Sequence, residues 1–349
     1  MSVAATGTPE VAVVVGAFGR RTYVRDAVGS VLAQSLPRER FEVVVLKDFA
    51  DPDLDRWLAE EGVRTVLDRE PRIGRWLLHA VRATRAPWVA FLDDDDEFEP
   101  ERLARVVEVG RAHPEVGFYR NRVLVIDAEG RRVDPHAWRP IERDAAFDRS
   151  GPILVRPTDK ADLAALVLRT THASFNSSTV AVRRELLEGP FGAAFESTQL
   201  PDLALLVAAA VAPCGLYLDD RRLTRFRHHG QNVTREVEWL RHAVESHANL
   251  AAVAGQLGRS DFADRLRATS QHYDRVYRTS AIVAAVRLGS PRDCVAGLTA
   301  GYLRFLGAHP DQRELRPDAW VAGVYAALYC LWPGLGRRVA LARFRPRWG

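Results

Sequence analysis

The sequence is poor in cysteine and in long apolar runs, and both shortages narrow the class of protein. Its three cysteines, Cys214, Cys294 and Cys330, lie far apart and lack the spacing of a metal site. We interpret them as reduced core thiols, which are typical of a cytoplasmic protein. The first ten residues have neither a basic nor an apolar stretch, so we expect no signal peptide. The first apolar run, residues 11–15, is too short to cross a bilayer.

An excess of positive charge is also absent. The chain has 49 basic and 45 acidic residues, a formal net charge of +4, and no long basic block. A protein that neutralises nucleic acid phosphates needs a concentrated basic surface, so we expect no nucleic acid partner. With 47% apolar residues, the composition is that of a globular protein with a substantial core.

The first hundred residues alternate between short apolar runs and stretches with helical periodicity. The apolar runs lie at residues 11–15, 41–46, 63–67 and 88–92. Between them, apolar residues recur every three or four positions, as they do in an amphipathic helix. This alternation predicts an α/β fold with a mostly parallel, Rossmann-like sheet and flanking helices. Ligands of such sheets bind beyond the carboxyl ends of the strands.

The later part of the chain follows a different pattern. Residues 122–133 are typical of a hairpin, residues 134–157 of a long polar loop, and a helix is expected near Pro201. From Arg235 onward the spacing of apolar residues is helical, with Gly258, Gly289 and Gly307 at expected helix ends. We therefore predict two halves of one α/β domain, residues 1–120 and 121–234, and an all-helical extension, residues 235–349.

The strongest chemical signal is an acidic run at the end of an expected buried strand. Phe91 and Leu92 are followed directly by four aspartates, Asp93, Asp94, Asp95 and Asp96. Neighbouring carboxylates repel one another, and a cation relieves that repulsion. Their oxygens suit Mg²⁺ or Mn²⁺, and such an ion stabilises the charge of a departing diphosphate. The alternative is a solvated acidic turn, but the position at a strand end favours a metal site.

Several segments together resemble glycosyltransferase family 2, whose members have the GT-A fold. The similar segments are residues 13–19, Ser-Val-Leu-Ala-Gln-Ser at 30–35, the aspartate-x-aspartate of 93–95, Pro201-Asp202, and residues 225–232. The resemblance implies an inverting, metal-assisted transfer of a sugar from a nucleoside-diphosphate sugar to an acceptor hydroxyl. Residues 1–120 are then the half that binds the nucleotide sugar, and residues 121–234 the half that binds the acceptor. The acceptor is a glycan, a lipid-linked molecule or a small molecule.

The resemblance also implies roles for single residues. Asp202 matches the catalytic base, which must lie near the acceptor hydroxyl to take its proton. Asp93, Asp95 and His229 match groups that hold the metal. The residues assigned to the nucleotide sugar are Ala17, Phe18, Asp48, Arg72, Gly74, Asp93, Asp94, Arg227 and His229. The segment of residues 172–177, which includes His172, Ser174, Asn176 and Ser177, is placed near the acceptor.

Some of these residues could have an ordinary structural role instead of a role in binding or catalysis. At other positions the sequence differs from the family pattern. Asp48 accepts a hydrogen bond from a nucleobase or simply ends a strand, and Asp202 is either the base or a carboxylate favoured by its helix dipole. Glu196 is the reserve candidate for the base. Lys47 stands where the family has an acidic residue. Arg72 and Gly74 precede a helix whose N-terminus suits a phosphate, although a surface ion pair fits Arg72 equally well.

Two other functions remain open at this point. A nucleotidyltransferase of similar fold needs a glycine-rich phosphate loop, which Gly19-Arg20-Arg21 imitates poorly. A non-catalytic sugar-nucleotide-binding or assembly protein would lack the metal carboxylates or the base, and this chain has both. A homo-oligomer is compatible with all of these functions.

The carboxyl-terminal end has an unusual distribution of charge. Residues 319–335 contain no charged side chain but include Trp320, Tyr325, Tyr329 and Trp332, and five arginines follow in the last thirteen residues. A buried core helix with a basic tail explains this pattern. The alternative is a peripheral contact with the inner face of a membrane, with the aromatic rings at the interface and the arginines on anionic headgroups.

Overall fold

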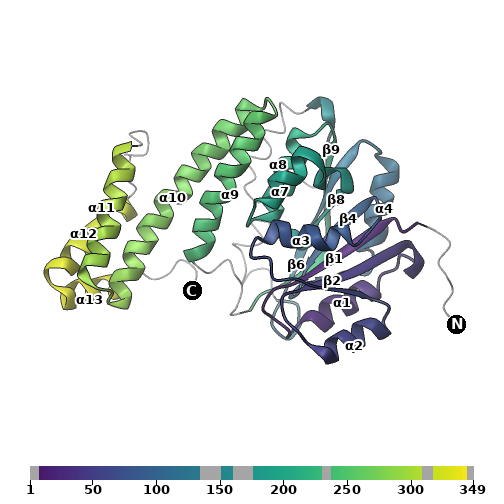
Figure 1. Ribbon diagram of the computed structural model, residues 1–349, viewed down its shortest axis with the longest axis horizontal. Helices are drawn as coiled ribbons and strands as arrows, with labels where there is room; N and C mark the ends of the chain where they lie inside the picture. The colour runs from purple at the N-terminus through teal and green to yellow at the C-terminus, as the bar shows by residue number, and fades with distance from the viewer. Residues whose placement is uncertain (1–7, 134–150, 160–175, 230–236, 309–316, 344–349) are drawn as a thin grey trace. The chain divides into compact units, whose positions relative to one another are not determined.

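The computed structural model describes residues 8–133, 151–159, 176–229, 237–308 and 317–343. The chain forms two compact units, the first of Met1–Gly230 with Ala252–Ala263 and the second of Gln231–Ala251 with Asp264–Gly349. The first unit contains a mixed sheet with flanking helices, and the second consists of helices (Figure 1).

The sheet of the first unit is parallel along one side and mixed along the other. Among the described residues its strands are β1 (Val11–Ala17), β2 (Phe41–Lys47), β3 (Arg64–Leu67), β4 (Trp88–Asp93), β5 (Glu97–Phe98), β6 (Val116–Ile126), β7 (Ile153–Val155), β8 (Val180–Arg183) and β9 (Gly215–Arg227). Their order is β3-β2-β1-β4-β8-β6-β9-β5, with β7 paired to β9. Strands β1 to β4 pair in parallel, whereas β8 pairs antiparallel with both β4 and β6. The predicted parallel, Rossmann-like half is confirmed.

Helices cover both faces of the parallel half. They are α1 (Val24–Leu32), α2 (Pro52–Glu60), α3 (Ile73–Arg82) and α4 (Arg102–Ala112). Later in the chain, α7 (Gly189–Glu196) packs against α3, and α8 (Pro201–Val211) packs against β6 and β9. Val13 and Val15 of β1 belong to one core cluster with residues of α1, α2 and α4. Gly16 faces the other way, and a Cβ there would lie 3.2 Å from the ring of Trp76 in α3. Burial on both faces explains why β1 is a continuous apolar run.

The middle of the chain differs from the sequence prediction in detail. The predicted hairpin is present, since Ile126 at the end of β6 bridges to Arg132. Leu216 and Leu223 lie in one long strand, β9. Strand β7 lies within the stretch expected to be a loop, of which residues 134–150 are outside the described part. Helix α4 begins at Arg102, two residues after Pro100.

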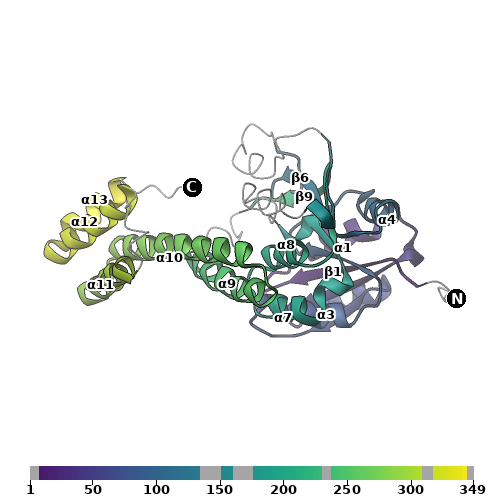
Figure 2. The ribbon, with the colours of Figure 1, turned by 90° about the horizontal axis from the view of Figure 1, so that it is seen from above.

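The second unit is helical, as predicted. Its helices are α9 (Val237–Gln256), α10 (Ser260–Leu288), α11 (Arg292–Ala308), α12 (Pro317–Leu331) and α13 (Pro333–Arg343). Helices α9 and α10 run side by side (Figures 1 and 2), and the Ser270 hydroxyl donates to the carbonyl of Val244 across them. Gly258 and Gly289 follow helix ends with φ of 73° and 72°, which glycine tolerates best. Gly307 is the second-to-last residue of α11, whose described part ends at Ala308.

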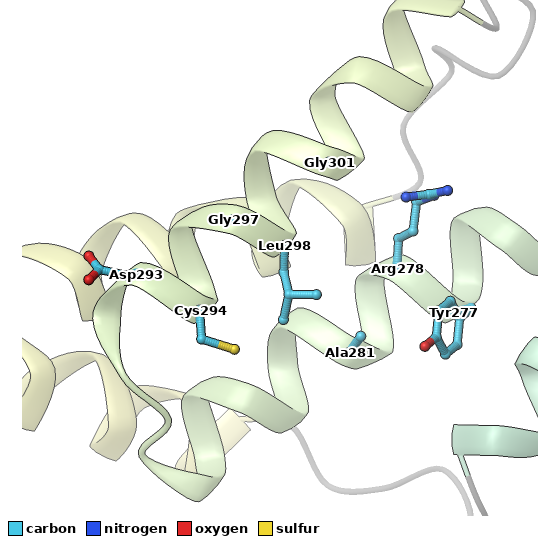
Figure 3. A pocket seen from close by; sticks show the side chains of 8 residues that line it. All are labelled: Tyr277, Arg278, Ala281, Asp293, Cys294, Gly297, Leu298 and Gly301. Atoms are coloured by element: carbon cyan, nitrogen blue, oxygen red, sulfur yellow. The ribbon is translucent and has the colours of Figure 1, made fainter.

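A pocket of about 420 Å³ lies between α10 and α11 of this unit (Figure 3). Its lining residues are Tyr277, Arg278, Ala281, Asp293, Cys294, Gly297, Leu298 and Gly301. Arg278 is already paired with Asp274, 3.0 Å away on the same helix. The lining therefore contains one cysteine, and its arginine is already in an ion pair.

No helix that the structure describes has both the length and the apolar character needed to cross a bilayer.

Candidate active site

The acidic run lies at the carboxyl edge of the parallel strands. Asp93 is the last residue of β4 and lies opposite Gly16 of β1 in the parallel register. The Asp94 N–H continues this pairing by donating to the Gly16 carbonyl at 3.1 Å. The loops after β1 and β4 are therefore neighbours, at the edge where α/β sheets bind their ligands.

Three of the four aspartates form a compact cluster. Single carboxylate oxygens of Asp93, Asp95 and Asp96 all lie within 4.8 Å of one another. Burial, and then the charge of Asp95, raises the pKa of Asp93 to about 7. The same two causes, with the added charge of Asp93, raise the pKa of Asp96 well above its ordinary value. Closely spaced, desolvated carboxylates fit a divalent cation, because the cation would relieve both the repulsion and the desolvation.

Asp96, which the sequence analysis did not include among the metal ligands, is held by three donors. Its oxygens accept hydrogen bonds from the Arg227 N–H at 2.9 Å, the Asn176 amide at 2.7 Å and the Ser178 hydroxyl at 2.6 Å. Asp93 accepts a hydrogen bond from the Ser177 hydroxyl at 2.7 Å. The segment before β8 thus orients the cluster, which is a role that its predicted position near the acceptor did not indicate.

Arg20 belongs to this site, although the sequence analysis gave it no role there. Its guanidinium donates to both oxygens of Asp94, at 3.1 and 2.7 Å, and lies 2.7 Å from an oxygen of Asp95. Burial lowers the pKa of Arg20, but the hydrogen bond to Asp94 and the charges of Asp95 and Asp94 outweigh it and raise that pKa. Its neighbour Arg21 is exposed and is 3.7 Å from Asp51. The Arg20 guanidinium therefore places a positive charge beside the acidic run.

His229 and Arg227 both reach the acidic run, in different ways. The His229 Nε2 lies 2.9 Å from an oxygen of Asp95, so the structure brings these two predicted metal ligands together. The Arg227 side chain is only 1% exposed, and it donates to the backbone carbonyls of Asp95 and Ala128, each at 2.9 Å. It also forms an ion pair with Glu97. Because these groups engage its guanidinium, Arg227 fastens β9 to the acidic run.

Asp202 lies in the first turn of α8, after Pro201. One of its oxygens accepts a hydrogen bond from the Leu203 N–H at 2.9 Å. Burial raises the pKa of Asp202 to about 6, while hydrogen bonds from the backbone of Leu203 and Asn176 and the charge of Arg120 act in the opposite direction. The group is therefore ionised at neutral pH but is a stronger base than an ordinary aspartate.

Asn176 connects Asp202 to the acidic cluster. Its backbone N–H bonds to Asp202, and its side-chain amide donates to Asp96. Its φ is 65°, and among the described residues it is the non-glycine residue with a positive φ. Such a conformation is disfavoured for a residue with a side chain, so the surrounding bonds must hold it. His172 and Ser174, from the same predicted segment, lie outside the described residues.

Three residues expected to bind the nucleotide sugar, Ala17, Phe18 and Asp48, flank the ends of β1 and β2. The Asp48 carboxylate accepts a hydrogen bond from the Gly19 N–H at 2.8 Å, where φ is 69°. It therefore fixes the turn after β1, whichever ligand it contacts. Ala17 ends β1 and is buried, whereas Phe18 is 51% exposed and packs edge-on against Trp76 with ring centres 5.6 Å apart.

The N-terminus of α3 is already bonded to protein. The Ile73 N–H donates to the Gln199 side chain at 3.2 Å, and the Gly74 N–H donates to the Thr198 carbonyl at 3.1 Å. A Cβ on Gly74 would come within 1.7 Å of the Phe195 carbonyl oxygen, so glycine allows this close packing. These two N–H groups are therefore already bonded and do not face a phosphate. The exposed Arg72 side chain is still compatible with the predicted phosphate contact.

The reserve candidate for the base has a different environment. Glu196, at the end of α7, lies 2.8 Å from Arg82 of α3. Both side chains are partly or largely exposed, as in an ordinary surface ion pair. Of these two carboxylates, Asp202 alone is tied to the acidic cluster.

The fold thus brings together an acidic cluster at the carboxyl edge of the sheet and a half-buried carboxylate, Asp202, in the first turn of α8. The family model for glycosyl transferase family 2 matches residues 12–187, half of the chain. The chain belongs to this family.

Similar proteins agree with this assignment. The crystal structure of S. aureus TarS 1–349 in complex with UDP-GlcNAc is similar over 95% of this chain and 89% of that one, with a TM-score of 0.60 and 14% identity. This likeness shows the fold. An uncharacterized glycosyltransferase of Nostoc sp. is 27% identical over 190 residues, which are 52% of this chain and 53% of the relative. The succinoglycan biosynthesis protein ExoO of Rhizobium meliloti is 36% identical over 29% of each chain. The matches thus span about half, or less, of these curated relatives.

Proposed function

We propose that this protein is an inverting glycosyltransferase that moves a sugar from a nucleoside-diphosphate sugar to an acceptor hydroxyl. The observation that carries the proposal is the half-buried Asp202 carboxylate, with a pKa of about 6, linked through Asn176 to the acidic cluster. A base beside a site for a charged leaving group is what a single displacement requires.

The donor side of the proposal combines the loops after β1, β2 and β4. TarS, which shares the fold, binds UDP-GlcNAc, and a nucleotide sugar is accordingly the proposed donor here. In this proposal Asp48 contacts the nucleobase through a hydrogen bond and the exposed Phe18 through its ring; the bond between Asp48 and the Gly19 N–H and the exposure of Phe18 support it. Arg20, beside Asp94 and Asp95, brings a positive charge to the position proposed for the diphosphate.

A divalent cation completes this proposal. Asp93 and Asp95 would hold Mn²⁺ or Mg²⁺, with His229 beside Asp95 as a further ligand. When bound, the ion stabilises the negative charge of the departing diphosphate. Asp96 is bonded to three protein donors, so its part is to keep the acidic loop in place.

Asp202 acts on the acceptor side. Its carboxylate accepts the proton of the acceptor hydroxyl while that oxygen bonds to the anomeric carbon and the diphosphate leaves. The N–H groups of Leu203 and Asn176 fix its orientation. Because a single displacement forms no covalent sugar–enzyme intermediate, the configuration of the anomeric carbon is inverted. A glycan, a lipid-linked molecule or a small molecule would supply the hydroxyl.

The test starts with a panel of nucleotide sugars incubated with the full chain and Mn²⁺, first alone and then with candidate acceptors. Hydrolysis identifies the donor, and the product's anomeric configuration, read by NMR, tests inversion. Retention of configuration would refute the single displacement. Lack of turnover of every nucleotide sugar, together with no binding of any nucleoside diphosphate by calorimetry, would refute the proposed reaction.

A further inference from the structure

The end of the helical unit exposes an apolar surface that the core does not use. Helix α12 buries Tyr325 and Tyr329 in the core of this unit. Three residues at and after its end do not join that core. Leu331, the last residue of α12, is 64% exposed, Trp332 in the turn is 61% exposed, and Leu335 in the first turn of α13 is 52% exposed. Leu288, the last residue of α10, is 79% exposed. We call these four residues, Leu288, Leu331, Trp332 and Leu335, the apolar tip.

Two hydrogen bonds show that the four residues lie at the same end of the unit. The Tyr329 hydroxyl, one turn before the tip residues of α12, donates to the Ser290 carbonyl at 2.7 Å. The Arg337 Nε donates to the Arg287 carbonyl, next to Leu288, at 2.9 Å. The turn between α12 and α13 is therefore fastened to the end of α10. Trp332 and Leu335, with Pro333 and Gly334, line a shallow open hollow there.

The charges around the apolar tip have one dominant sign. Arg337 and Arg338 are exposed directly after it, and Arg287 precedes Leu288. Residues 319–349 contain five arginines and no aspartate or glutamate. The acidic residue nearest along the adjoining α11 is Asp293, which follows the exposed Arg292. The surface thus combines exposed tryptophan and leucine with cationic side chains.

We propose that the apolar tip and its arginines dock this protein on an anionic lipid surface. Tryptophan and leucine enter the boundary between headgroups and acyl chains, while arginines bind the anionic headgroups. The charge argues against a second copy of this chain as the occupant, because a two-fold contact would bring the arginines of both copies together. Tyr325 and Tyr329 are in the core of this unit, so the proposal does not use the whole charge-free run. It uses only the exposed end of that run.

Co-sedimentation of the full chain with vesicles tests this proposal. The chain is mixed at low salt with vesicles of phosphatidylcholine and phosphatidylglycerol, and separately with vesicles of pure phosphatidylcholine. We expect binding to the anionic vesicles, its loss at high salt, and much weaker binding to the neutral ones. Trp332→Ser and Leu335→Ser, made separately, each weaken binding. Arg338→Glu weakens it by about 25-fold, because each elementary charge near such a surface is worth about five-fold.

Helix α11 offers matched controls in the same unit. Leu303 is 63% exposed, like the tip residues, and Arg304 beside it is also exposed. Leu303→Ser and Arg304→Glu should leave binding unchanged. Equal losses in these controls, equal binding to neutral vesicles, or no binding by the native chain would each overturn the proposal. It would also be overturned if Trp332→Ser dissociated an oligomer in analytical ultracentrifugation and vesicles were not bound. Because no turnover is measured, these outcomes leave the proposed sugar transfer untouched.

Discussion

Replacing Asp202 by asparagine should abolish most activity and at the same time stabilise the fold. The substitution keeps the size of the side chain but removes its ability to accept a proton. We expect the turnover of sugar transfer to fall by roughly 10²–10⁴-fold, the range for a lost general base. Binding of the nucleoside diphosphate should survive, because Asp48 and Arg20 lie on other loops.

The stability effect follows from the raised pKa of Asp202. Its pKa in the folded protein is about 6, whereas the ordinary pKa of an aspartate is 3.8. Folding therefore favours the protonated carboxyl, and the native chain loses stability as the pH rises from about 4 through 6. Two pKa units correspond to about 3 kcal/mol, an upper limit on the gain from removing the charge. Asparagine cannot accept both backbone N–H bonds equally well, so we expect a gain of about 1–2 kcal/mol at pH 8.

Urea unfolding of the metal-free chain at pH 8 and pH 4 measures this gain, and single-turnover kinetics measures the loss of activity. At pH 4 the gain should nearly vanish, because the native carboxyl is then mostly protonated. Glu196→Gln is the matched control: its ion pair with Arg82 is on the surface, so turnover should change little and no gain that depends on pH should appear. Near-normal turnover in Asp202→Asn, or an equal loss of stability at both pH values, would refute the reasoning.

Three further predictions concern the donor side. EDTA should abolish transfer and Mn²⁺ restore it, whereas Asp95→Ala should fail to respond to Mn²⁺; full activity of that variant without metal would exclude the metal role. Arg20→Ala should tighten Mn²⁺ binding, measured by electron paramagnetic resonance, by about tenfold or roughly 1.4 kcal/mol, because a competing cation is removed. Arg21→Ala, which changes the exposed neighbour, should leave Mn²⁺ binding unchanged. Weaker Mn²⁺ binding in Arg20→Ala would show that Arg20 only supports the loop. Asp48→Ala should weaken nucleoside diphosphate binding in calorimetry, and an unchanged dissociation constant would leave Asp48 only its bond to Gly19.

The parallel half of the fold was predictable because its signals are local. Strands buried on both faces read as apolar runs, and parallel strands end at one edge, so the position of Asp93 at that edge follows from the sequence. The insertion of β8 between β4 and β6 does not follow, because a four-residue strand has no signal that names its partners. The resemblance supplied the GT-A fold, which local patterns alone do not specify.

The missed parts of the site depend on contacts between distant segments. Arg20 lies three residues after the end of β1. Because parallel strands end at one edge, its position near the end of β4 could have been predicted in the same way as that of Asp93. Asn176 offered no such signal, because its positive φ exists only in the folded chain. Arg227 was assigned to the diphosphate by resemblance, but its burial and its bonds to backbone carbonyls appear only in three dimensions.

The bond between Asp96 and the Arg227 N–H bears on how the protein is made. The two residues are 131 positions apart, and His229 meets Asp95 across 134 positions. During synthesis the acidic run leaves the ribosome long before these partners exist, so its charges repel one another with only nearby Arg20 to offset them. We therefore expect the acidic run at the end of β4 to become ordered late in folding, after β9 has joined the sheet. A fragment that stops at residue 187, the end of the family match, would carry the aspartates and the residues 176–178 that bond to them, but not Arg227 and His229.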